Sequence, residues 1–255
     1  MTVRPEDHQI STRVANEAGT LLLALREKLS GEGVDSKTLK DEGDRQAHEL
    51  IMKALREVVP ADDAILSEEG ADDLARLDVS RVWIVDPLDG TREFSEPPRS
   101  DWAVHIALTI DGVAVAGAVA LPALGETMST EPAPSAPPPM PATPRVVVSR
   151  TRPPAAAKIL AEVLGADLVE MGSAGAKSMS VLRGESDVYA HSGGQYEWDS
   201  CAPAAVAAAA GMHVSRVDGS PMRYNNENPY LPDLLICRPE LAEQALQVFR
   251  DNPPE

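Results

Sequence analysis

The sequence predicts a mixed fold in which an α+β half is followed by an α/β half. In the first half, two segments with apolar residues at helical spacing precede four strand-like segments, and an Asp111-Gly112 turn between the last two predicts an antiparallel hairpin. In the second half, short apolar runs alternate with helical segments, an order typical of an α/β layer. A proline-rich stretch at residues 132–144 separates the two patterns.

The first half opens with two predicted helices that should pack on a sheet. Apolar residues recur at Leu21, Leu25 and Leu29 in the first helix, and the second shows the same spacing. We expect helices over 10–29 and 45–59, and strands over 64–66, 81–85, 103–110 and 113–121. The hairpin turn then joins the last two strands in one antiparallel sheet.

The second half alternates strands and helices to the end of the chain. We expect strands over 145–149, 168–170, 187–191, 213–216 and 234–237, and helices over 153–164, 174–183, 200–210 and 239–249. Ser173 and Asp199 are predicted N-caps, because their side-chain oxygens can accept from free helical N–H groups. Gly184 and Gly211 are predicted to end the helices that precede them.

The proline-rich stretch divides the chain into predicted units. Seven of the thirteen residues in 132–144 are proline, which cannot donate a backbone hydrogen bond and does not support a packed element. We expect a metal-binding α+β unit at 1–131, a linker or surface loop at 132–144, and an α/β unit at 145–255. The composition is compatible with either a loop of the fold or a tether.

The amino-acid composition limits the kinds of partner and compartment that we expect for this protein. The chain of 255 residues has 40 acidic and 23 basic residues, a net charge of −17, which argues against nucleic-acid polymers and anionic membranes as partners. The two cysteines, Cys201 and Cys237, have no zinc or redox spacing, which favours a reducing compartment. No segment has the length of a membrane helix, and the first residues do not resemble a signal peptide. We expect a cytoplasmic protein.

The most informative segment is residues 82–94, where an apolar strand runs into Asp86-Pro87-Leu88-Asp89-Gly90-Thr91. Asp86 and Asp89 offer the hard oxygen ligands that Mg²⁺ prefers, and the bend at Pro87 can direct the Leu88 carbonyl toward the same ion. Gly90 and Thr91 then open a predicted helix, whose free N–H groups would face a phosphate.

Two more acidic segments extend this pattern. Glu68 follows a short strand, and Asp199 precedes an alanine-rich helix. Taken singly, each acidic residue has an ordinary alternative: Asp89-Gly90 is a common turn, Asp199 a common N-cap, and Glu68 a solvated surface charge. Their combination, in this order along the chain, favours a metal site.

On these motifs, from about residue 14 to about residue 238, the chain resembles the inositol monophosphatase superfamily of Mg²⁺-dependent, lithium-sensitive phosphatases, and within it the CysQ-type 3′(2′),5′-bisphosphate nucleotidases. The resemblance implies a five-layered α/β/α/β/α sandwich with the site between the two halves. It also implies that Glu68, Asp86 and the Leu88 carbonyl hold one Mg²⁺, and that Asp86, Asp89 and Asp199 hold a second. A third ion near Glu68, Mn²⁺ as an alternative metal, and inhibition by Li⁺ and Ca²⁺ are further implications.

The resemblance also implies a proton-handling pair. Asp44 falls where the family places an aspartate that accepts a hydrogen bond from the motif threonine, here Thr91, which helps to orient and deprotonate the attacking water. Glu68 shares in placing that water. The alternative is that Asp44 is only a helix N-cap. The chain has Glu42-Gly43 where the monophosphatases have Val-Thr, so the local geometry differs from theirs.

The predicted substrate pocket combines Gly90 and Thr91 with residues of the second half. Ser173 and Lys177 lie in a segment, Gly-Ser-Ala-Gly-Ala-Lys, that resembles the part of the nucleotidases that holds the phosphate not cleaved. His191, before a Gly-Gly loop, lies where relatives contact the substrate ring. Lys177 as a solvated helix residue and His191 as a structural histidine are the alternatives.

These observations lead to one main hypothesis and two rivals. The first is an Mg²⁺-dependent phosphatase that removes the 3′-phosphate of 3′-phosphoadenosine 5′-phosphate to give AMP, in the context of sulfate assimilation, and that also acts on the sulfated form. The second is an inositol-1-phosphate or fructose-1,6-bisphosphate phosphatase. The third is an inactive metal-dependent sensor or interaction protein. The resemblance also suggests a homodimer.

Overall fold

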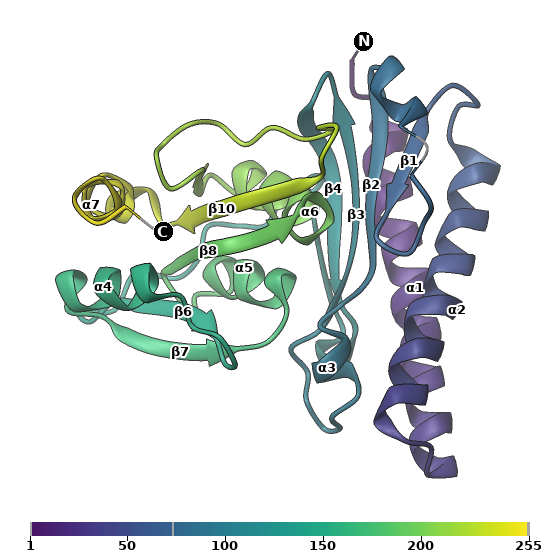
Figure 1. The fold of residues 1–255 in the computed structure, drawn as a ribbon, viewed down its shortest axis with the longest axis horizontal. Coiled ribbons are helices and arrows are strands. Elements are labelled where there is room, and N and C mark those ends of the chain that lie inside the picture. Colours follow the sequence, from purple (N-terminus) through teal and green to yellow (C-terminus); the bar gives the residue numbers. More distant parts are fainter. Residues whose placement is uncertain (1, 73, 254–255) are drawn as a thin grey trace.

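The computed structural model describes residues 2–72 and 74–253, and it has the predicted five layers (Figure 1). Helices α1 and α2 cover the outer face of the first sheet, and α5 and α6 lie between the two sheets. Helices α4 and α7 cover the outer face of the second sheet. The helices are α1 Pro5–Glu32, α2 Ser36–Val58, α3 Thr91–Phe94, α4 Ala155–Leu164, α5 Ala174–Leu182, α6 Glu197–Ala209 and α7 Pro239–Asp251.

The first sheet has the strand order β1-β2-β3-β4-β5. Strand β1 is parallel to β2, and all other neighbours are antiparallel. The turn between β3 and β4 is the predicted hairpin, with Asp111 and Gly112 both at positive φ (50° and 75°). The short strand β5 was not predicted, because its four residues show no apolar run. The strands are β1 Ala64–Ser67, β2 Arg81–Asp89, β3 Ala103–Ile110, β4 Val113–Leu121 and β5 Glu126–Ser129.

The second sheet has the strand order β7-β6-β8-β10-β9. Strands β7 and β8 flank β6 in parallel, whereas β10 is antiparallel to both β8 and β9. This crossover pattern matches the predicted α/β half. The strands are β6 Arg145–Ser149, β7 Asp167–Met171, β8 Val188–Tyr196, β9 His213–Ser215 and β10 Tyr230–Cys237.

The central helix layer joins the two sheets through one apolar cluster that draws residues from both. Helix α6 approaches β4 closely, because a side chain on Gly117 would lie only 3.4 Å from the Ala202 Cα. The alanine-rich sequence of α6 therefore serves close packing. Two short 3₁₀ helices, Ala75–Asp78 and Pro122–Leu124, complete the described elements.

Two boundaries differ from the predictions in ways that matter for the site. Helix α2 begins at Ser36, where the Asp35 carboxylate caps it by accepting from Thr38 N at 2.7 Å, so Asp44 lies inside the helix and is not its N-cap. Helix α6 begins at Glu197, so Asp199 is its third residue and the N-cap prediction for Asp199 is wrong. Ser173 is the N-cap of α5, as predicted.

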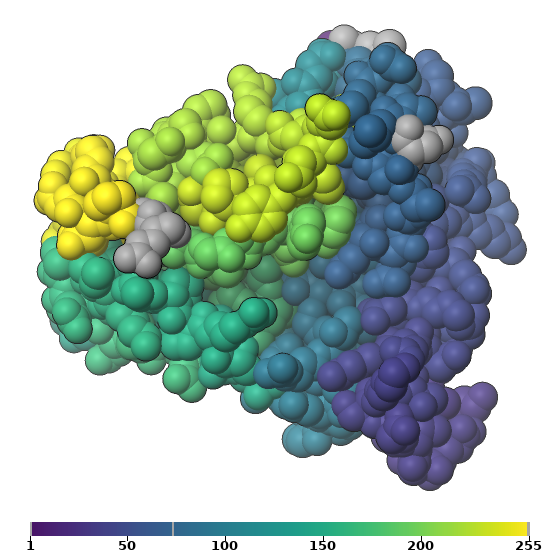
Figure 2. Space-filling view, viewed as in Figure 1, coloured from purple at the N-terminus to yellow at the C-terminus, as the bar shows by residue number. Residues whose placement is uncertain are grey.

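Residues 132–144 contain no helix or strand and run between β5 and β6. The segment is attached to the second half, since the Arg238 Nη2 donates to the Pro138 carbonyl at 2.7 Å. In the space-filling view, the purple-to-blue N-terminal half and the green-to-yellow C-terminal half meet along a continuous boundary (Figure 2). The three-part division of the chain stays a prediction.

Candidate active site

The end of β2 places the first two acidic residues. All nine residues of β2 are buried, and its ladder to β3 pairs Asp86 with His105 and then, after an irregularity, Asp89 with Ala103. The Leu88 N–H donates to Asp86 Oδ1 at 3.0 Å within this irregular stretch. Because Pro87 and Leu88 interrupt the strand, both carboxylates can face the same side of the structure.

Asp199 completes a cluster of three carboxylates at the start of α6. One carboxylate oxygen from each of Asp86, Asp89 and Asp199 lies within 4.8 Å of the others. The backbone N–H of Tyr196 fixes Asp199 by donating to its Oδ2 at 2.6 Å. Two segments that are far apart in the sequence, the end of β2 and the start of α6, thus meet in one acidic group, as the motifs predict.

The cluster has an excess of negative charge. Burial, followed by repulsion from Glu68 and the other carboxylates, raises the pKa of Asp86 well above its usual value. Burial and repulsion by Asp89 raise the pKa of Asp199 to about 6. Such a set of close oxygen ligands fits a hard divalent cation, whose charge would remove the repulsion. The acidic group can therefore hold a metal ion.

Glu68 lies beside this group, close enough for its carboxylate to interact with those of Asp199 and Asp86. Desolvation of its carboxylate, together with repulsion by Asp199, raises the pKa of Glu68 to about 7. Glu68 follows β1, the parallel neighbour of β2, and its N–H donates to the Val85 carbonyl at 3.2 Å. The pairing of β1 with β2 therefore brings the predicted ligand Glu68 to the cluster.

Asp89 differs from the other carboxylates because it has strong hydrogen-bond donors. It accepts from Ser173 Oγ at 2.5 Å, Ala174 N at 3.1 Å and Gly175 N at 2.6 Å, so it binds the N-terminus of α5. Burial alone would raise its pKa, but the contacts with His105, Lys177 and Ser173 lower the pKa of Asp89 to about 2. Asp89 thus links the first sheet to the central helix layer.

His105 is a buried neighbour of Asp89 that no motif of the sequence singles out. Its Nε2 lies 3.2 Å from Asp89 Oδ2, and its Nδ1 lies 3.0 Å from the Trp198 carbonyl oxygen. The Trp198 carbonyl can only accept, so Nδ1 donates to it. A positive charge on the ring would face the Asp89 carboxylate, although Nε2 does not meet hydrogen-bond geometry there. Burial opposes this charge, but the Asp89 carboxylate raises the pKa of His105. The antiparallel register that pairs Asp86 with His105 is the signal that could have located it.

Asp44 lies near the cluster because the preceding residue, Gly43, lets helix α2 pack closely against the metal motif. A side chain on Gly43 would lie 2.8 Å from Leu88 Cδ2 and 2.9 Å from Phe94 Cε1, so only glycine lets α2 approach the metal motif this closely. Burial, followed by repulsion from Glu69 and Glu68, raises the pKa of Asp44 to about 7. Within the described part of the chain, no hydrogen bond joins the Thr91 hydroxyl to Asp44, which departs from the expected pair.

A cavity of about 600 Å³ opens beside the cluster. Asp89 and Asp199 lie in its wall, whereas the predicted acidic residues Glu68, Asp86 and Asp44 are not among its lining residues. All the predicted substrate-binding residues line it: Gly90, Thr91, Ser173, Lys177 and His191. The structure therefore brings the predicted pocket residues together at one cavity.

Two of these predicted residues are held by contacts within the protein. Lys177 Nζ donates to the Gly172 and Ser173 carbonyls, the latter at 2.7 Å, and burial lowers its pKa. His191 Nε2 lies 2.9 Å from the Gly194 carbonyl oxygen, and burial lowers its pKa as well. Lys177 is buried, so its alternative as a solvated helix lysine is wrong.

Three arginines also lie in the cavity wall: Arg92, which follows the metal motif, and Arg150 and Arg152, which no motif of the sequence singled out. Arg150 bridges the halves by pairing with Glu93 at 2.6 Å and Glu96 at 2.8 Å. The guanidinium groups of Arg92 and Arg152 have no ion pair with any described residue and are exposed. For Arg150 and Arg152, the available signal was their position directly after strand β6. They give an acidic protein local cations for an anionic ligand.

The comparisons with known proteins agree with this geometry. The family model described as inositol monophosphatase family matches residues 6–253. The chain belongs to the inositol monophosphatase family. It is 52% identical over 244 residues to the 3′-phosphoadenosine 5′-phosphate phosphatase of Mycobacterium tuberculosis, covering 92% of this chain and 90% of that protein. It is 32% identical over 204 residues to the 3′(2′),5′-bisphosphate nucleotidase CysQ of Escherichia coli, covering 74% and 80%.

Among solved structures, the crystal structure of CysQ from Bacteroides thetaiotaomicron matches with a TM-score of 0.76 and 28% identity, covering 91% of this chain and 97% of that one. The predicted family and the five-layered fold are therefore confirmed. This family of phosphatases depends on Mg²⁺ in general, and the acidic group fits that requirement. None of the helices described is both long and apolar enough to traverse a lipid bilayer.

Proposed function

We propose that the protein removes the 3′-phosphate of 3′-phosphoadenosine 5′-phosphate, giving AMP and orthophosphate. The observation that carries this proposal is the acidic cluster of Asp86, Asp89 and Asp199 beside a cavity that also presents the exposed arginines Arg92 and Arg152. The names of the mycobacterial relatives support the same substrate, since the identity extends over nearly the whole chain. Action on the sulfated form and a place in sulfate assimilation belong to the same proposal.

Glu68, Asp86 and the Leu88 carbonyl would hold one Mg²⁺, and Asp86, Asp89 and Asp199 a second. A bound Mg²⁺ would neutralise the charge of the phosphoryl oxygens and activate the water that attacks the phosphorus. The short distances within the acidic group and its raised pKa values support these assignments. A third ion near Glu68, use of Mn²⁺, and inhibition by Li⁺ and Ca²⁺ remain part of the proposal, as do a cytoplasmic location and a homodimer.

Asp44 and Thr91 would handle the proton of the attacking water. A pKa of about 7 lets Asp44 exchange a proton near neutral pH, which is the range required of a general base. The Thr91 hydroxyl has no partner among the described side chains and lies in the cavity wall, where it can orient a ligand. Glu68, with its pKa also near 7, is the second candidate for this task.

The phosphate that is not cleaved would bind among Ser173, Lys177 and the arginines. Lys177 Nζ faces the carbonyls at the start of α5, so it holds the Gly172–Ser173 turn in place and adds positive charge behind it. Arg92 and Arg152 would meet the phosphate from the open side. Gly90 and Thr91 would bind the phosphate that is cleaved through the N-terminus of α3.

The decisive experiment compares phosphate release from 3′-phosphoadenosine 5′-phosphate, inositol 1-phosphate and fructose 1,6-bisphosphate at one Mg²⁺ concentration. We expect kcat/KM to favour the nucleotide by about tenfold or more, which equals about 1.4 kcal/mol of discrimination in the transition state. The Asp86→Asn variant, purified in the same way, controls for contaminating phosphatases. Preference for inositol or fructose phosphate would contradict the substrate, and release from none of them would favour the inactive sensor.

A further inference from the structure

Two exposed tyrosines stand in the wall of the cavity. Tyr196 is 46% exposed and Tyr230 is 45% exposed, and both line the cavity beside Asp199. Among the exposed large hydrophobic side chains of the described residues, these two are the aromatic ones. Aromatic rings left open to solvent at a cavity are suited to contact the flat face of a ligand.

The tyrosines are held in defined positions. The Tyr196 ring stacks on Trp198 with centroids 4.8 Å apart and 7° between the planes, and it meets Tyr230 edge to face at 6.0 Å and 84°. The pairing of β8 with β10 sets Tyr196 directly opposite Tyr230. The strand pairing and the ring contacts therefore prepare the arrangement before any ligand binds.

The Tyr230 ring packs directly against Gly194. Gly194 has φ 91°, and a side chain there would lie 2.0 Å from the Tyr230 hydroxyl oxygen, so the phenol ring lies across the bare glycine backbone. The Gly194 carbonyl is in turn fixed by His191 Nε2 at 2.9 Å. The His191–Gly194 contact thus supports the position of Tyr230.

Gln195 adds an unused polar group at the same place. Its side chain lies in the cavity wall and is 7% exposed, yet neither Nε2 nor Oε1 has a hydrogen-bond partner in the described part of the protein. A buried amide without partners is destabilising, so such a group in a binding site indicates a ligand that supplies them. A glutamine amide presents one donor and one acceptor side by side, the pattern that matches the N6 and N7 edge of adenine.

We propose that Gln195, Tyr196 and Tyr230 form a base wall that binds the purine base of the nucleotide. Tyr196 and Tyr230 contact the ring system, and the Gln195 amide pairs with its polar edge. The base wall adjoins the acidic cluster, because the backbone N–H of Tyr196 donates to Asp199 Oδ2 at 2.6 Å. A single nucleotide can therefore place its base on the wall and a phosphate at the cluster. This inference rests on the proposed nucleotide substrate and assigns the residues that select it.

The test compares two bisphosphates that differ only in the base. One is 3′-phosphoadenosine 5′-phosphate, and the other is the same sugar bisphosphate with hydrogen in place of the base. We expect Tyr230→Ala and Tyr196→Ala to lower kcat/KM for the nucleotide by about fivefold or more, mainly through KM, and to leave the value for the baseless compound within about twofold. Tyr230→Phe and Tyr196→Phe keep the ring and should retain most of the activity.

Gln195→Met keeps the length of the side chain but removes the amide, and we expect the same selective loss with the nucleotide. Equal losses on both compounds in all three variants would assign these residues a structural role and overturn the base wall. Retention of full activity on the nucleotide in the tyrosine variants would overturn it as well. If the wild-type protein hydrolyses neither compound, the proposed function fails instead, and AMP binding followed by Trp198 fluorescence still tests the wall.

Discussion

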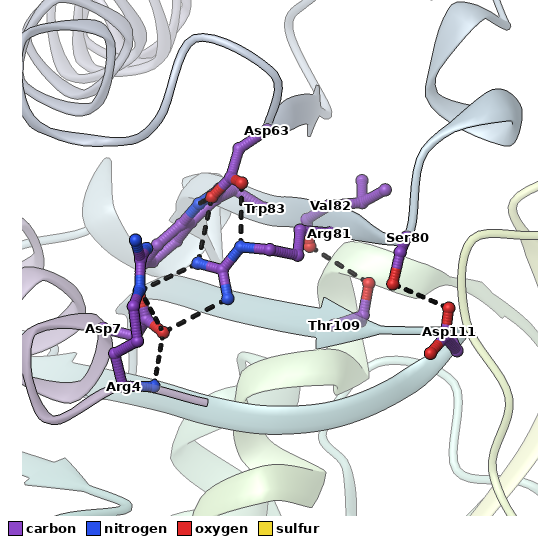
Figure 3. A network of polar contacts seen from close by, with 9 residues as sticks. All are labelled: Arg4, Asp7, Asp63, Ser80, Arg81, Val82, Trp83, Thr109 and Asp111. Atoms are coloured by element: carbon purple, nitrogen blue, oxygen red, sulfur yellow. Dashed lines mark hydrogen bonds and ion pairs between the residues drawn. The ribbon is translucent and has the colours of Figure 1, made fainter. Parts of the chain in front are cut away.

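The two ends of strand β2 carry two buried groups of charged residues that are built in opposite ways. At the start of β2, Arg81 Nη2 contacts Asp7 Oδ1 at 2.9 Å and Arg81 Nε contacts Asp63 Oδ1 at 2.8 Å (Figure 3). Arg4 also binds Asp7 at 2.7 Å. At the other end of the same strand, Asp86 and Asp89 meet Asp199 with no arginine among them.

The difference appears in the titration of the buried carboxyl groups. Burial alone would raise the pKa of Asp7, but hydrogen bonds from Arg4 and Arg81 hold it below its usual value. Burial also acts on Asp86, and there the neighbouring charges are negative, so its pKa lies well above the usual value. One strand thus contains a group whose charges are paired within the protein and another in which Asp89 has protein partners but Asp86 is repelled, a repulsion that an added cation would relieve.

This contrast distinguishes charged residues that stabilise the fold from charged residues that serve catalysis. The paired network ties α1 and the β1 edge to β2, and Trp83 Nε1 joins it by donating to Asp63 Oδ2 at 2.9 Å. The acidic cluster destabilises the metal-free fold by its own repulsion, which is typical of sites kept for catalysis. We therefore expect substitutions at the two ends to affect different properties of the protein.

The largest effect should come from Asp86→Asn. Loss of the carboxylate shared by both proposed metal sites should lower kcat/KM by at least about a thousandfold, since the metal supplies several kcal/mol of transition-state stabilisation. The same change should leave the metal-free protein at least as stable at pH 8, because it removes a repelled charge. Phosphate release and chemical denaturation measure the two effects. Loss of both activity and stability would mean that Asp86 is primarily structural.

Asp86→Asn is a better test than Asp89→Ala, which we also expect to abolish most turnover. The Asp89 carboxylate caps α5 and lies 3.2 Å from the His105 ring, so its removal should destabilise the fold as well.

Arg81→Met should have the reverse effect. The variant leaves the buried Asp7 and Asp63 carboxylates without their shared partner, which should lower the free energy of unfolding by about 3 kcal/mol or more. Turnover per folded molecule should stay within about twofold, because the network lies at the opposite end of β2 from the cluster. A large loss of kcat in the folded variant would show that the two ends are coupled.

Much of the fold could be predicted from the sequence because its signals are local. Helical spacing, the Asp111-Gly112 turn and the alternating second half are each visible in short segments, and the structure has them. Boundaries were less accurate: α2 begins nine residues before the predicted start, since Asp35 caps it and polar residues fill its first turns. Strand β5 escaped prediction because only its pairing with β4 defines it.

The acidic residues of the site were predictable because each follows or begins a recognisable element. The supporting residues were not, because their roles depend on contacts between distant segments. Gly43 matters only through Leu88 and Phe94, and His105 only through its contact with Asp89. No single segment of the sequence indicates these contacts, because each joins residues that are far apart along the chain. The role of Asp44 that the family resemblance implies stays a prediction, and among the described residues no hydrogen bond joins Asp44 to the Thr91 hydroxyl.

The smallest expected effect is the pH dependence of the metal-free protein. Asp44 and Glu68 have pKa values of about 7 in the folded state, and the pKa of Asp86 is also raised, whereas unfolded carboxyl groups titrate near 4. The folded protein therefore holds more protons than the unfolded chain above pH 4, and its stability falls as pH rises through 7. In the presence of a chelator, we expect the Tm to fall by about 4 °C or more between pH 6.5 and pH 8.5.

Two controls test whether this fall of the Tm with rising pH, here called the slope, comes from the acidic cluster. Saturating Mg²⁺ should flatten it, because the cation favours the ionised carboxylates, and Asp86→Asn should reduce it without metal. Arg81→Met, although less stable, should keep the slope of the wild type, because the Asp7 carboxylate keeps its hydrogen bonds from Arg4. If Arg81→Met changed the slope as much as Asp86→Asn, the two ends of β2 would not be the separate charge systems inferred from their contacts.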